Sequence, residues 1–477
     1  MPETMLVPQI IQGGMGVAVS NWRLARAVAG LGQLGVVSGT VIDTVLVRRL
    51  QDGDPGGHMR RAMAHFPIAR AAEEALRRYF LPAGRPAGRP YRLLPVLRAK
   101  VSPARLELMM LAAFVEVWLA KEGHEGPVGM NLLTKVQIPT LPTLYGAMLA
   151  GVEYVLMGAG IPRDIPGALD LLAGHRPARL RFEVEGATDH PGIDLEFDPQ
   201  AHWDAPPPSL ARPRFLPIIA SNSLATLLAR KASGRVDGFV VEGPIAGGHN
   251  APPRGPARFN DSGEPLYGDR DVVDLAALKA LGLPFWIAGG EGHPESLRAA
   301  RAAGAAGIQV GTLFAYCEES GFAPELKSSV LEHAARGEVT VRTDPRVSPT
   351  GYPFKVVDWP CNPVHGAVRE RVCDMGYLRV AYRKPEGGIG YRCAAEPEDQ
   401  YLSKAGRAED TVDRQCLCNG LTAAVGLAQH RKDGVVELPV VTSGDNLTGI
   451  AGFLAGRLRY TAADVIDYLL GAMPASV

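Results

Sequence analysis

Short apolar runs recur along the first two thirds of the chain, and most are followed by glycine and then by a stretch with helical spacing of apolar positions. Runs that are apolar on both faces and alternate with helical patterns are typical of parallel strands covered by helices. Eight such units favour a (β/α)8 barrel, an α/β fold, with an open doubly wound sheet as the alternative. The eight predicted strands lie in "PQIIQGG", "LGVVSGT", "GPVGMNLL", "EYVLMGAG", "FLPIIASN", "DGFVVEG", "PFWIAGG" and "GIQVGTLF".

Two long stretches interrupt this alternation. Residues 45–121 separate the second and third strands and are too long for a simple connection, so we expect a helical insertion. This insertion carries 14 Lys and Arg against 6 Asp and Glu, which fits either a solvated cap or a docking face for an acidic partner. Residues 176–214 contain "RLRFEVEGA" and "IDLEFDP", which predict an inserted hairpin.

The regular alternation stops near residue 335. We therefore expect a barrel domain over residues 1–335, with the two insertions, and a loop-rich, cysteine-containing C-terminal extension over residues 336–477. The extension closes with a helix that Thr461 can cap and that we expect to pack on the main body. Its predicted apolar face consists of Ala462, Val465, Ile466, Leu469 and Leu470.

Charge and composition narrow the class of protein. Lys plus Arg and Asp plus Glu number 50 each, so net charge gives no reason to expect nucleic acid or a membrane surface as a partner. No apolar run reaches the roughly 18 residues of a membrane span. The first residues lack the pattern of a signal peptide. Six cysteines in so long a chain fit a reducing compartment, so we expect a cytoplasmic protein. The sequence does not indicate its oligomeric state.

The loops after the last two predicted strands have the features of an anion site. Gly289 and Gly290 end the seventh strand and Pro294 follows at a helix start, where exposed N–H groups attract anions. Gly311 and Thr312 end the eighth strand and would lie beside the same anion, since ligands bind at the carboxyl ends of barrel strands. These loops therefore predict a phosphate site.

The sixth predicted strand ends in "VVEGPIAGGH", which places two ionisable groups beside glycines. His249 has an ordinary pKa near neutrality, so it can exchange a proton, or it can be a hydrogen-bonded loop residue. Glu242 is interpreted as a residue that binds backbone N–H groups rather than substrate. Gln12, at the end of the first strand, is expected to hydrogen-bond a cofactor or the backbone.

Most of the cysteines lie in the extension, at positions 361, 373, 393, 416 and 418. With His365 they resemble a zinc set, but no paired C-x-x-C knuckles are present. We interpret them as reduced, packed thiols and predict no metal. Zinc binding and redox chemistry between Cys416 and Cys418 are the alternatives.

Five motifs occur in an order that resembles one known family: "IIQGGMG", "GMNLL", "VVEGPIAGGH", "IAGGEG" and "GIQVGTLF". Together they resemble the nitronate monooxygenase (2-nitropropane dioxygenase) family, whose pattern the flavin-dependent enoyl-ACP reductases share. The resemblance covers roughly residues 5–335, and "SPTGYPFK" resembles a segment that follows the barrel in the same family.

The resemblance implies FMN in a TIM barrel, with His249 as the catalytic residue beside the flavin. Glu291 would repel a phosphate and is expected to face outward. Ser221 stands where relatives often carry a polar or charged residue near the ring. The implied cofactor-binding residues are Gly13, Gly14, Met15, Asn131, Ser221, Glu242, Gly247, Gly248, Gly289, Gly290, Gly311 and Thr312.

The function that the resemblance implies is FMN-dependent oxidation of nitronates, or of related carbanion-forming substrates, by oxygen to a carbonyl compound and nitrite. The first alternative is an FMN- and NAD(P)H-dependent enoyl-thioester reductase, with an acyl carrier protein docked on the basic insertion. A non-catalytic flavin-binding partner subunit is the second. No separate nicotinamide fingerprint follows a strand, which favours the oxygen-dependent activity.

Overall fold

A computed structural model of the chain describes residues 7–186, 193–431 and 434–472. Its centre is one parallel sheet of eight strands, and these are the eight segments expected from the apolar runs. Around the sheet they follow one another in chain order. Their bounds are β1 Ile10–Gln12, β2 Gly35–Ser38, β3 Val128–Leu133, β4 Tyr154–Gly158, β8 Arg214–Ile219, β9 Phe239–Glu242, β10 Phe285–Ala288 and β11 Gly307–Val310.

The sheet curves until its first and last members meet. β1 pairs with β11, with Ile10 opposite Ile308, and on its other side Ile11 forms a parallel bridge with Leu34, directly before β2. The Gln12 N–H donates to the Leu34 carbonyl at 3.0 Å, and the Leu34 N–H donates to the Ile10 carbonyl at 3.1 Å. This is a barrel and not an open sheet, so the predicted (β/α)8 fold is confirmed.

Apolar side chains fill the barrel interior. Trp286 is the largest of them, and its indole N–H donates to the carbonyl of Pro8 at 2.8 Å, which satisfies the buried donor. The barrel is thus a packed core, and only its ends are open to ligands. The other interior residues are Ile11, Leu34, Val36, Tyr154, Leu156, Leu216, Val240 and Ala288.

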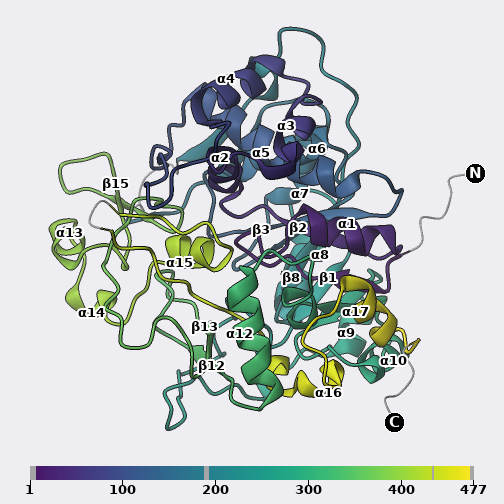
Figure 1. Ribbon diagram of the computed structural model, residues 1–477. Helices are drawn as coiled ribbons and strands as arrows, with labels where there is room; N and C mark the ends of the chain where they lie inside the picture. The colour runs from purple at the N-terminus through teal and green to yellow at the C-terminus, as the bar shows by residue number, and fades with distance from the viewer. Residues whose placement is uncertain (1–6, 187–192, 432–433, 473–477) are drawn as a thin grey trace, which may run out of the picture.

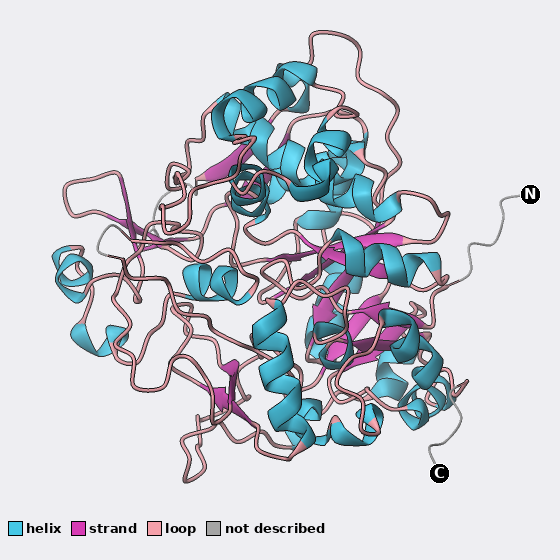
Figure 2. Cartoon of the chain, viewed as in Figure 1, coloured by secondary structure: helices cyan, strands magenta, loops and turns pink. Residues whose placement is uncertain are grey.

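Helices surround the strands, as Figure 2 shows. Asn21 caps the first of them by accepting hydrogen bonds from the N–H groups of Arg23 and Leu24. Apart from α3 and α4, the helices before residue 336 are α1 Trp22–Gly30, α2 Ile42–Gln51, α5 Pro103–Lys121, α6 Thr140–Leu149, α7 Ile165–Ala173, α8 Asn222–Lys231, α9 Leu275–Lys279, α10 Pro294–Ala302, α11 Thr312–Ala315 and α12 Pro324–Ala335.

Between β2 and β3 the chain forms further helices, α3 His58–Met63 and α4 Ala69–Tyr79, which pack with α2 on α5. Many of its basic side chains are used internally. Arg49 pairs with Glu116, and Arg70 pairs with Glu107 at 2.6 Å. Arg48 is buried and donates to the carbonyl of Leu427. Much of the local positive charge is therefore neutralised within the molecule.

The second expected insertion contains two strands that pair antiparallel, as in a hairpin: β5 Ala178–Arg181 and β7 Asp194–Phe197. A short strand between them in sequence, β6 Val184–Glu185, pairs instead with β14 of the C-terminal extension. The insertion thus contacts the extension as well as the barrel.

Residues 336–472 consist mostly of loops, with short elements between them. In Figure 1 this green-to-yellow part of the chain runs along one side of the barrel and returns beneath it to α1 and α10. Its elements are β12 Thr340–Asp344, β13 Phe354–Asp358, β14 Val380–Arg383, β15 Ile389–Arg392, α13 Glu398–Ser403, α14 Ala408–Thr411, α15 Leu417–Ala424, α16 Ala451–Leu454 and α17 Ala462–Leu469. It also contains the 3-10 turn η4 Asp445–Gly449, whereas the 3-10 turns η1 Pro55–Gly57, η2 Pro199–His202 and η3 Asp269–Asp271 lie before residue 336.

The final helix, α17, begins where the sequence predicts. The Thr461 hydroxyl accepts from the N–H of Asp464, whose carboxylate accepts from the N–H of Thr461, so each satisfies the other. Ala462, Val465, Ile466 and Leu469 are buried against the main body. Leu470 was expected on the same face but is 46% exposed, because the helix ends at Leu469 and the chain turns away.

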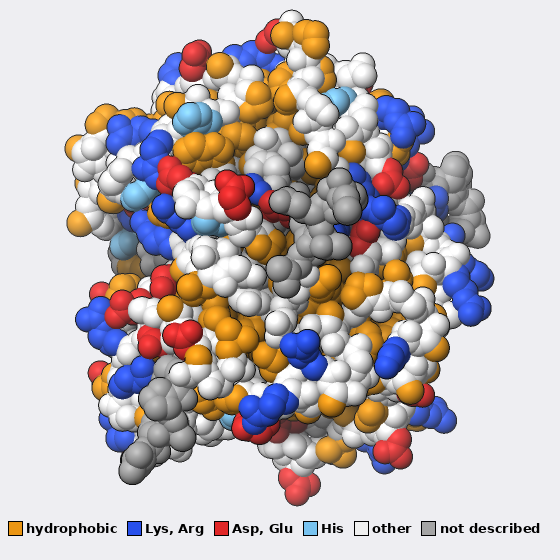
Figure 3. Space-filling model, turned by 90° about the vertical axis from the view of Figure 1, so that its right-hand side faces the viewer, with side chains coloured by type: hydrophobic (Ala, Val, Ile, Leu, Met, Phe, Trp, Pro, Cys, Tyr) orange, Lys and Arg blue, Asp and Glu red, His pale blue; other side chains and the backbone are white. Residues whose placement is uncertain are grey.

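In the part of the chain that the structure describes, every helix is too short or too polar to traverse a lipid bilayer. On the molecular face in Figure 3, basic and acidic side chains are interspersed, and no broad area of a single charge is visible. This distribution agrees with a net charge of zero.

Candidate functional site

A cavity of about 210 Å³ opens at the carboxyl ends of the barrel strands. Eleven of the twelve residues predicted to bind the cofactor, together with His249, lie on its wall. The exception is Ser221, whose hydroxyl caps α8 by accepting from the N–H of Leu224 at 3.0 Å. The predicted set therefore gathers at one place, in the part of a barrel where ligands bind.

The loop after β1 is held by a buried polar cluster. Gln12 accepts from the N–H of Val36 at 3.0 Å and donates to Ser20, whose hydroxyl in turn donates to the carbonyl of Gly13 at 2.8 Å. Gln12 is thus a backbone-binding residue, one of the two roles expected for it. Gly14 packs so closely on Asn131 that a Cβ at this position would lie 2.1 Å from the Asn131 Cβ. Only glycine allows this loop to lie along β3.

The loops after β10 and β11 form the predicted cradle for an anion. Gly290 has φ +85°, a conformation that favours glycine. The N–H groups of Gly290 and Gly311 have no hydrogen-bond acceptor among the described residues. The Thr312 hydroxyl accepts from the N–H of Gly444 at 3.2 Å, so its own proton is free to be donated into the cavity. These donors suit a phosphate.

Several polar side chains on the cavity wall have no hydrogen-bond partner among the described residues, among them Asn131, Glu242 and Gln309. The Gln309 side-chain oxygen is fully buried. Unpaired buried polar groups are unfavourable in a closed protein, so they indicate a ligand with its own donors and acceptors. Gln309 was missed in the sequence, although its polar side chain in the otherwise apolar β11 is a signal.

His249 stands at the edge of the cavity with a defined partner. Its Nε2 lies 2.7 Å from the hydroxyl of Ser348, and its ring contacts Phe354 edge-on at 4.8 Å between centroids. Burial lowers its pKa from 6.5 to about 4. The imidazole is therefore uncharged at neutral pH, whereas the sequence suggested titration near neutrality.

Burial in the same cavity shifts the pKa of Glu242 in the opposite direction to that of His249. Burial raises the pKa of its carboxyl from 4.5 to about 7, and none of the described Lys or Arg side chains opposes this shift. A large fraction of Glu242 is consequently protonated at neutral pH and can donate a hydrogen bond. The expected role, binding backbone N–H groups, finds no such contact among the described residues.

The remaining wall of the cavity comes from the C-terminal extension, which the sequence analysis did not include in the site. A Cβ at Gly247 would lie 2.8 Å from the backbone of Ser443 and Gly444, so the extension lies directly on this loop. The Gly248 N–H donates to the Thr442 hydroxyl at 2.9 Å, and the Gly248 carbonyl accepts from the N–H of Lys355 at 2.9 Å. The residues that the extension adds are Phe354, Tyr377, Leu378, Leu417, Cys418, Leu421, Thr442, Ser443, Gly444 and Asn446.

These contacts explain the glycine pair before His249. The loop after β9 runs between two segments of the extension, and Gly247 leaves room for one of them. The ammonium of Lys355 binds the carboxylate of Asp445 at 2.6 Å and joins the two segments. Short polar residues in "VVTSGDN" are the available sequence signal, but they are common in turns.

Glu291 does not behave as expected. It lies on the wall of the cavity rather than facing outward, and burial raises the pKa of its carboxyl. A hydrogen bond to Ser296 partly offsets that shift. Because burial favours the neutral acid, the repulsion of an anion by this side chain is reduced.

Among the described residues, no three His, Cys, Asp or Glu side chains are arranged to hold a metal ion, and the six cysteines form no disulfide. Cys361 is exposed and Cys317 is buried under the barrel helices. The other four share one apolar cluster in the extension: Cys373, Cys393, Cys416 and Cys418.

Comparison with known proteins finds sequence similarity over part of the chain. A family model described as nitronate monooxygenase matches residues 210–347, which include β8 to β11. A probable nitronate monooxygenase of Bacillus subtilis is 37% identical over 97 residues, 20% of this chain. The match spans 26% of that relative's length.

Solved structures are similar to this chain at low sequence identity. The enoyl reductase domain of MlnA from Bacillus amyloliquefaciens has 11% identity and a TM-score of 0.50, over 97% of this chain and 93% of that chain. FabK from Thermotoga maritima has 17% identity and a TM-score of 0.47, over 98% and 93%. The resemblance to the nitronate monooxygenase family is thus confirmed over residues 210–347, which contain three of the five motifs, "VVEGPIAGGH", "IAGGEG" and "GIQVGTLF".

Proposed function

We propose that this protein is an FMN-dependent enzyme that oxidises nitronates, or related carbanion-forming substrates, with oxygen to a carbonyl compound and nitrite. One observation carries the proposal. The nitronate monooxygenase match covers residues 210–347, which supply Glu242, His249 and both glycine loops of the cavity.

The residues present fit FMN. The N–H groups of Gly290 and Gly311 and the Thr312 hydroxyl would hold the phosphate. The unpaired Asn131, Glu242 and Gln309 side chains would face the polar edge of the flavin ring, with the β1 loop along the ring. The flavin, when bound, supplies the chemistry of accepting electrons from a substrate carbanion and passing them to oxygen.

The side chains set the charge that a substrate meets. A nitronate is already a carbanion equivalent, so the reaction needs no strong base, and a neutral His249 can position the anion through an N–H without changing charge. Protonated Glu242 avoids repelling it. Because the Glu242 carboxyl ionises near pH 7, we expect nitronate affinity to weaken as the pH rises above 7.

The test mixes the protein, reconstituted with FMN, with propionate 3-nitronate or propyl-2-nitronate and follows oxygen and nitrite. A parallel anaerobic arm offers NADH or NADPH, watches the flavin bleach, and then adds an enoyl thioester. We expect oxygen consumption with nitrite release. Rapid bleaching by NAD(P)H, reoxidation by the thioester and no nitrite would favour the enoyl reductase instead.

The cofactor has its own test. A single anion cradle predicts FMN rather than FAD, and the flavin released on denaturation identifies it by chromatography. Release of FAD, or no flavin uptake in excess FMN, would contradict the cofactor proposal.

The basic insertion would favour a carrier-protein partner and so the enoyl reductase. It lends that alternative less support because residues such as Arg49 and Arg70 are paired internally.

A further inference from the structure

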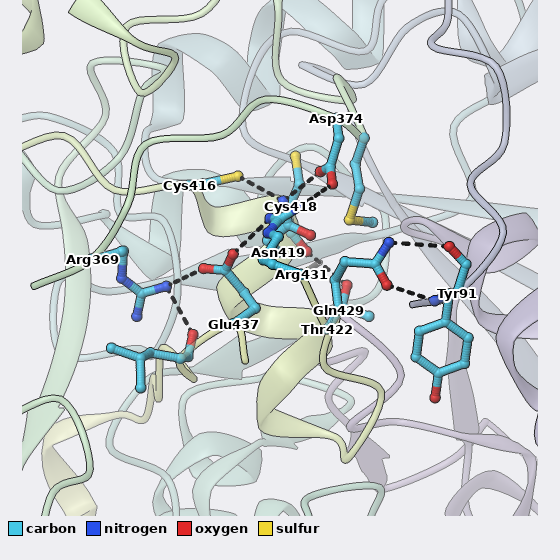
Figure 4. A network of polar contacts seen from close by, with 12 residues as sticks. Tyr91, Arg369, Asp374, Cys416, Cys418, Asn419, Thr422, Gln429, Arg431 and Glu437 are labelled. Carbon is cyan, nitrogen blue, oxygen red and sulfur yellow. Dashed lines mark hydrogen bonds and ion pairs between the residues drawn. The ribbon is translucent and has the colours of Figure 1, made fainter. Parts of the chain in front are cut away.

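Two cysteines separated by one residue lie at the start of α15. Cys416 is the residue before the helix, and Cys418 lies in its first turn. Both side chains belong to one buried apolar cluster. The side-chain nitrogen of Asn419 donates a hydrogen bond to the Cys416 sulfur at 3.6 Å, as Figure 4 shows. The Cys416 sulfur is thus held by a donor from the same helix.

This arrangement separates the two thiols chemically. Hydrogen bonds from Cys418 and Asn419 lower the pKa of Cys416 against the effect of burial. The pKa of Cys418 is raised, because its proton is held by Cys416 and because it is buried. A thiolate and a thiol side by side are the reactants of thiol–disulfide chemistry.

The pair also spans a wall between two spaces. Cys418 lies on the wall of the flavin cavity, beside Leu417 and Leu421. Cys416 lies on the wall of a separate outer pocket that is lined by Arg369, Arg371 and Arg414, among others. Cys416 is only 8% exposed, and this outer pocket gives a small oxidant an approach to it that does not cross the first cavity.

The neighbouring charges are neutralised, so they do not block a thiolate. Asp374 accepts from Asn419 at 2.7 Å and pairs with Arg431, and Glu437 pairs with both Arg431 and Arg369 (Figure 4). A second thiol pair, Cys373 and Cys393, lies beside the first and is joined by its own hydrogen bond. This second pair, of which Cys373 is partly exposed, provides an internal comparison for Cys416.

We propose that Cys416 and Cys418 form a redox-active dithiol that hydrogen peroxide converts to a disulfide in the cavity wall. The Cys416 thiolate attacks one peroxide oxygen, the O–O bond breaks, and hydroxide leaves and takes up a proton to become water. The Cys418 sulfur then attacks the resulting sulfenic acid, the S–O bond breaks and a second water leaves. The two thiols lose two electrons, and the peroxide gains them.

Peptide mapping tests this on the full-length protein, with or without flavin. The Cys361→Ser variant removes the exposed thiol and is used as the background. Trypsin places Cys416 and Cys418 in one peptide, residues 415–431, and Cys373 and Cys393 in two others, residues 372–379 and 393–404. After mild peroxide and alkylation of free thiols, we expect the 415–431 peptide to carry no alkyl group and a mass about 2 Da below its reduced form.

Variants assign the two roles. Cys416→Ser should abolish the reaction at this peptide, and Cys418→Ser should stop it at a sulfenic acid that dimedone captures. Cys373→Ser is the matched control and should leave the 416–418 disulfide unchanged. Thermal unfolding checks that each variant is folded. If a variant does not fold, the peptide mapping of the Cys361→Ser protein alone still tests the proposal.

Four results would overturn the proposal. They are a disulfide that joins two different peptides, oxidation to sulfinic acid without a disulfide, thiols that react only after unfolding, and stoichiometric zinc bound to the cysteines of the purified protein. Reversal by dithiothreitol, with recovery of both thiols, is expected.

Discussion

The barrel and the C-terminal extension build opposite walls of one cavity by different means. The barrel wall comes from eight strands in register, so each contributes at its carboxyl end. The extension wall comes from short segments near residues 354, 377, 417 and 443, which lie far apart in sequence and are joined mostly by loops. A repeating scaffold can therefore be recognised in a sequence, whereas a wall made of separate segments is defined only by its tertiary contacts with the barrel.

The largest effect is expected from removing the C-terminal extension, which forms one of the two walls. A chain that stops at residue 335 should be insoluble or lack a cooperative unfolding transition, because the extension adds buried side chains to the main core. Each buried large apolar residue contributes about 1.5–3 kcal/mol, against a total stability of about 5–15 kcal/mol. The core residues lost would include Trp359, Val441, Leu447, Ile450, Phe453 and Leu454.

Circular dichroism and urea unfolding of the purified fragment provide the measurement. A soluble fragment with a sharp transition would mean that the barrel folds alone and that the extension is a cover added to a complete domain.

The next prediction compares the two partners of one hydrogen bond, His249 from the barrel and Ser348 from the extension. His249→Ala should keep the flavin spectrum and lower kcat/KM about 10–100-fold, because it removes an N–H donor to a charged substrate, worth about 1.5–3 kcal/mol. Ser348→Ala removes one hydrogen bond to the ring, worth about 1 kcal/mol, and should lower kcat/KM only about fivefold. Steady-state kinetics on propionate 3-nitronate measure both, and unchanged kcat/KM in His249→Ala would leave the histidine a structural role.

Glu242 allows a test that needs neither flavin nor substrate. Its folded pKa, about 7, lies above the ordinary 4.5, so its contribution to stability is present below pH 4.5 and is lost as the pH rises through 7. Glu242→Gln should therefore make the apoprotein more stable than the wild type at pH 8, by up to about 3 kcal/mol. The difference should vanish near pH 4.

Urea unfolding of the two apoproteins at both pH values measures this difference. Equal stabilities at pH 8 would show that the carboxyl has an ordinary pKa, and the proposed uncharged state of the cavity would then be wrong.

The smallest expected effect concerns the anion cradle. Gly290→Val places a side chain where φ is +85° and a Cβ would lie 2.4 Å from Ile245, so the loop must shift and FMN affinity should fall about tenfold or more. Gly282→Val is the matched control, because φ there is +75° but open space surrounds it and it lies outside the cavity. Flavin fluorescence titration compares the two, and equal affinities would mean that the phosphate lies elsewhere.

Sequence reasoning located the barrel well because its evidence is periodic. Buried strands of three to six residues recur at each unit and most are followed by glycine, and the same turns bring Gly13, Asn131, Gly290 and Thr312 to one end. Tertiary contacts that have no period were missed. Gly247 lines the cavity, but the sequence gives no sign of its contact with Ser443 and Gly444, which lie almost 200 residues later in the chain. Local patterns do not encode such a contact.

Single residues show the same limit. Ser221 resembles a ligand-binding polar residue but caps a helix, because both tasks use a small hydroxyl at the end of a strand. The pKa of His249 depends on burial by Phe354 and its neighbours from the extension, so no motif around the histidine indicates it.

The contact of Gly247 and Gly248 with residues 442–444 also has a consequence in time. Ribosomes add about 5–20 residues per second, and barrel units can begin to fold as they emerge. The cavity nevertheless lacks one wall, including the donor to Thr312, until Gly444 has been synthesised. A nascent chain thus carries a nearly finished scaffold for several seconds before it can enclose a ligand, so capture of the proposed flavin has to wait until Gly444 has been made.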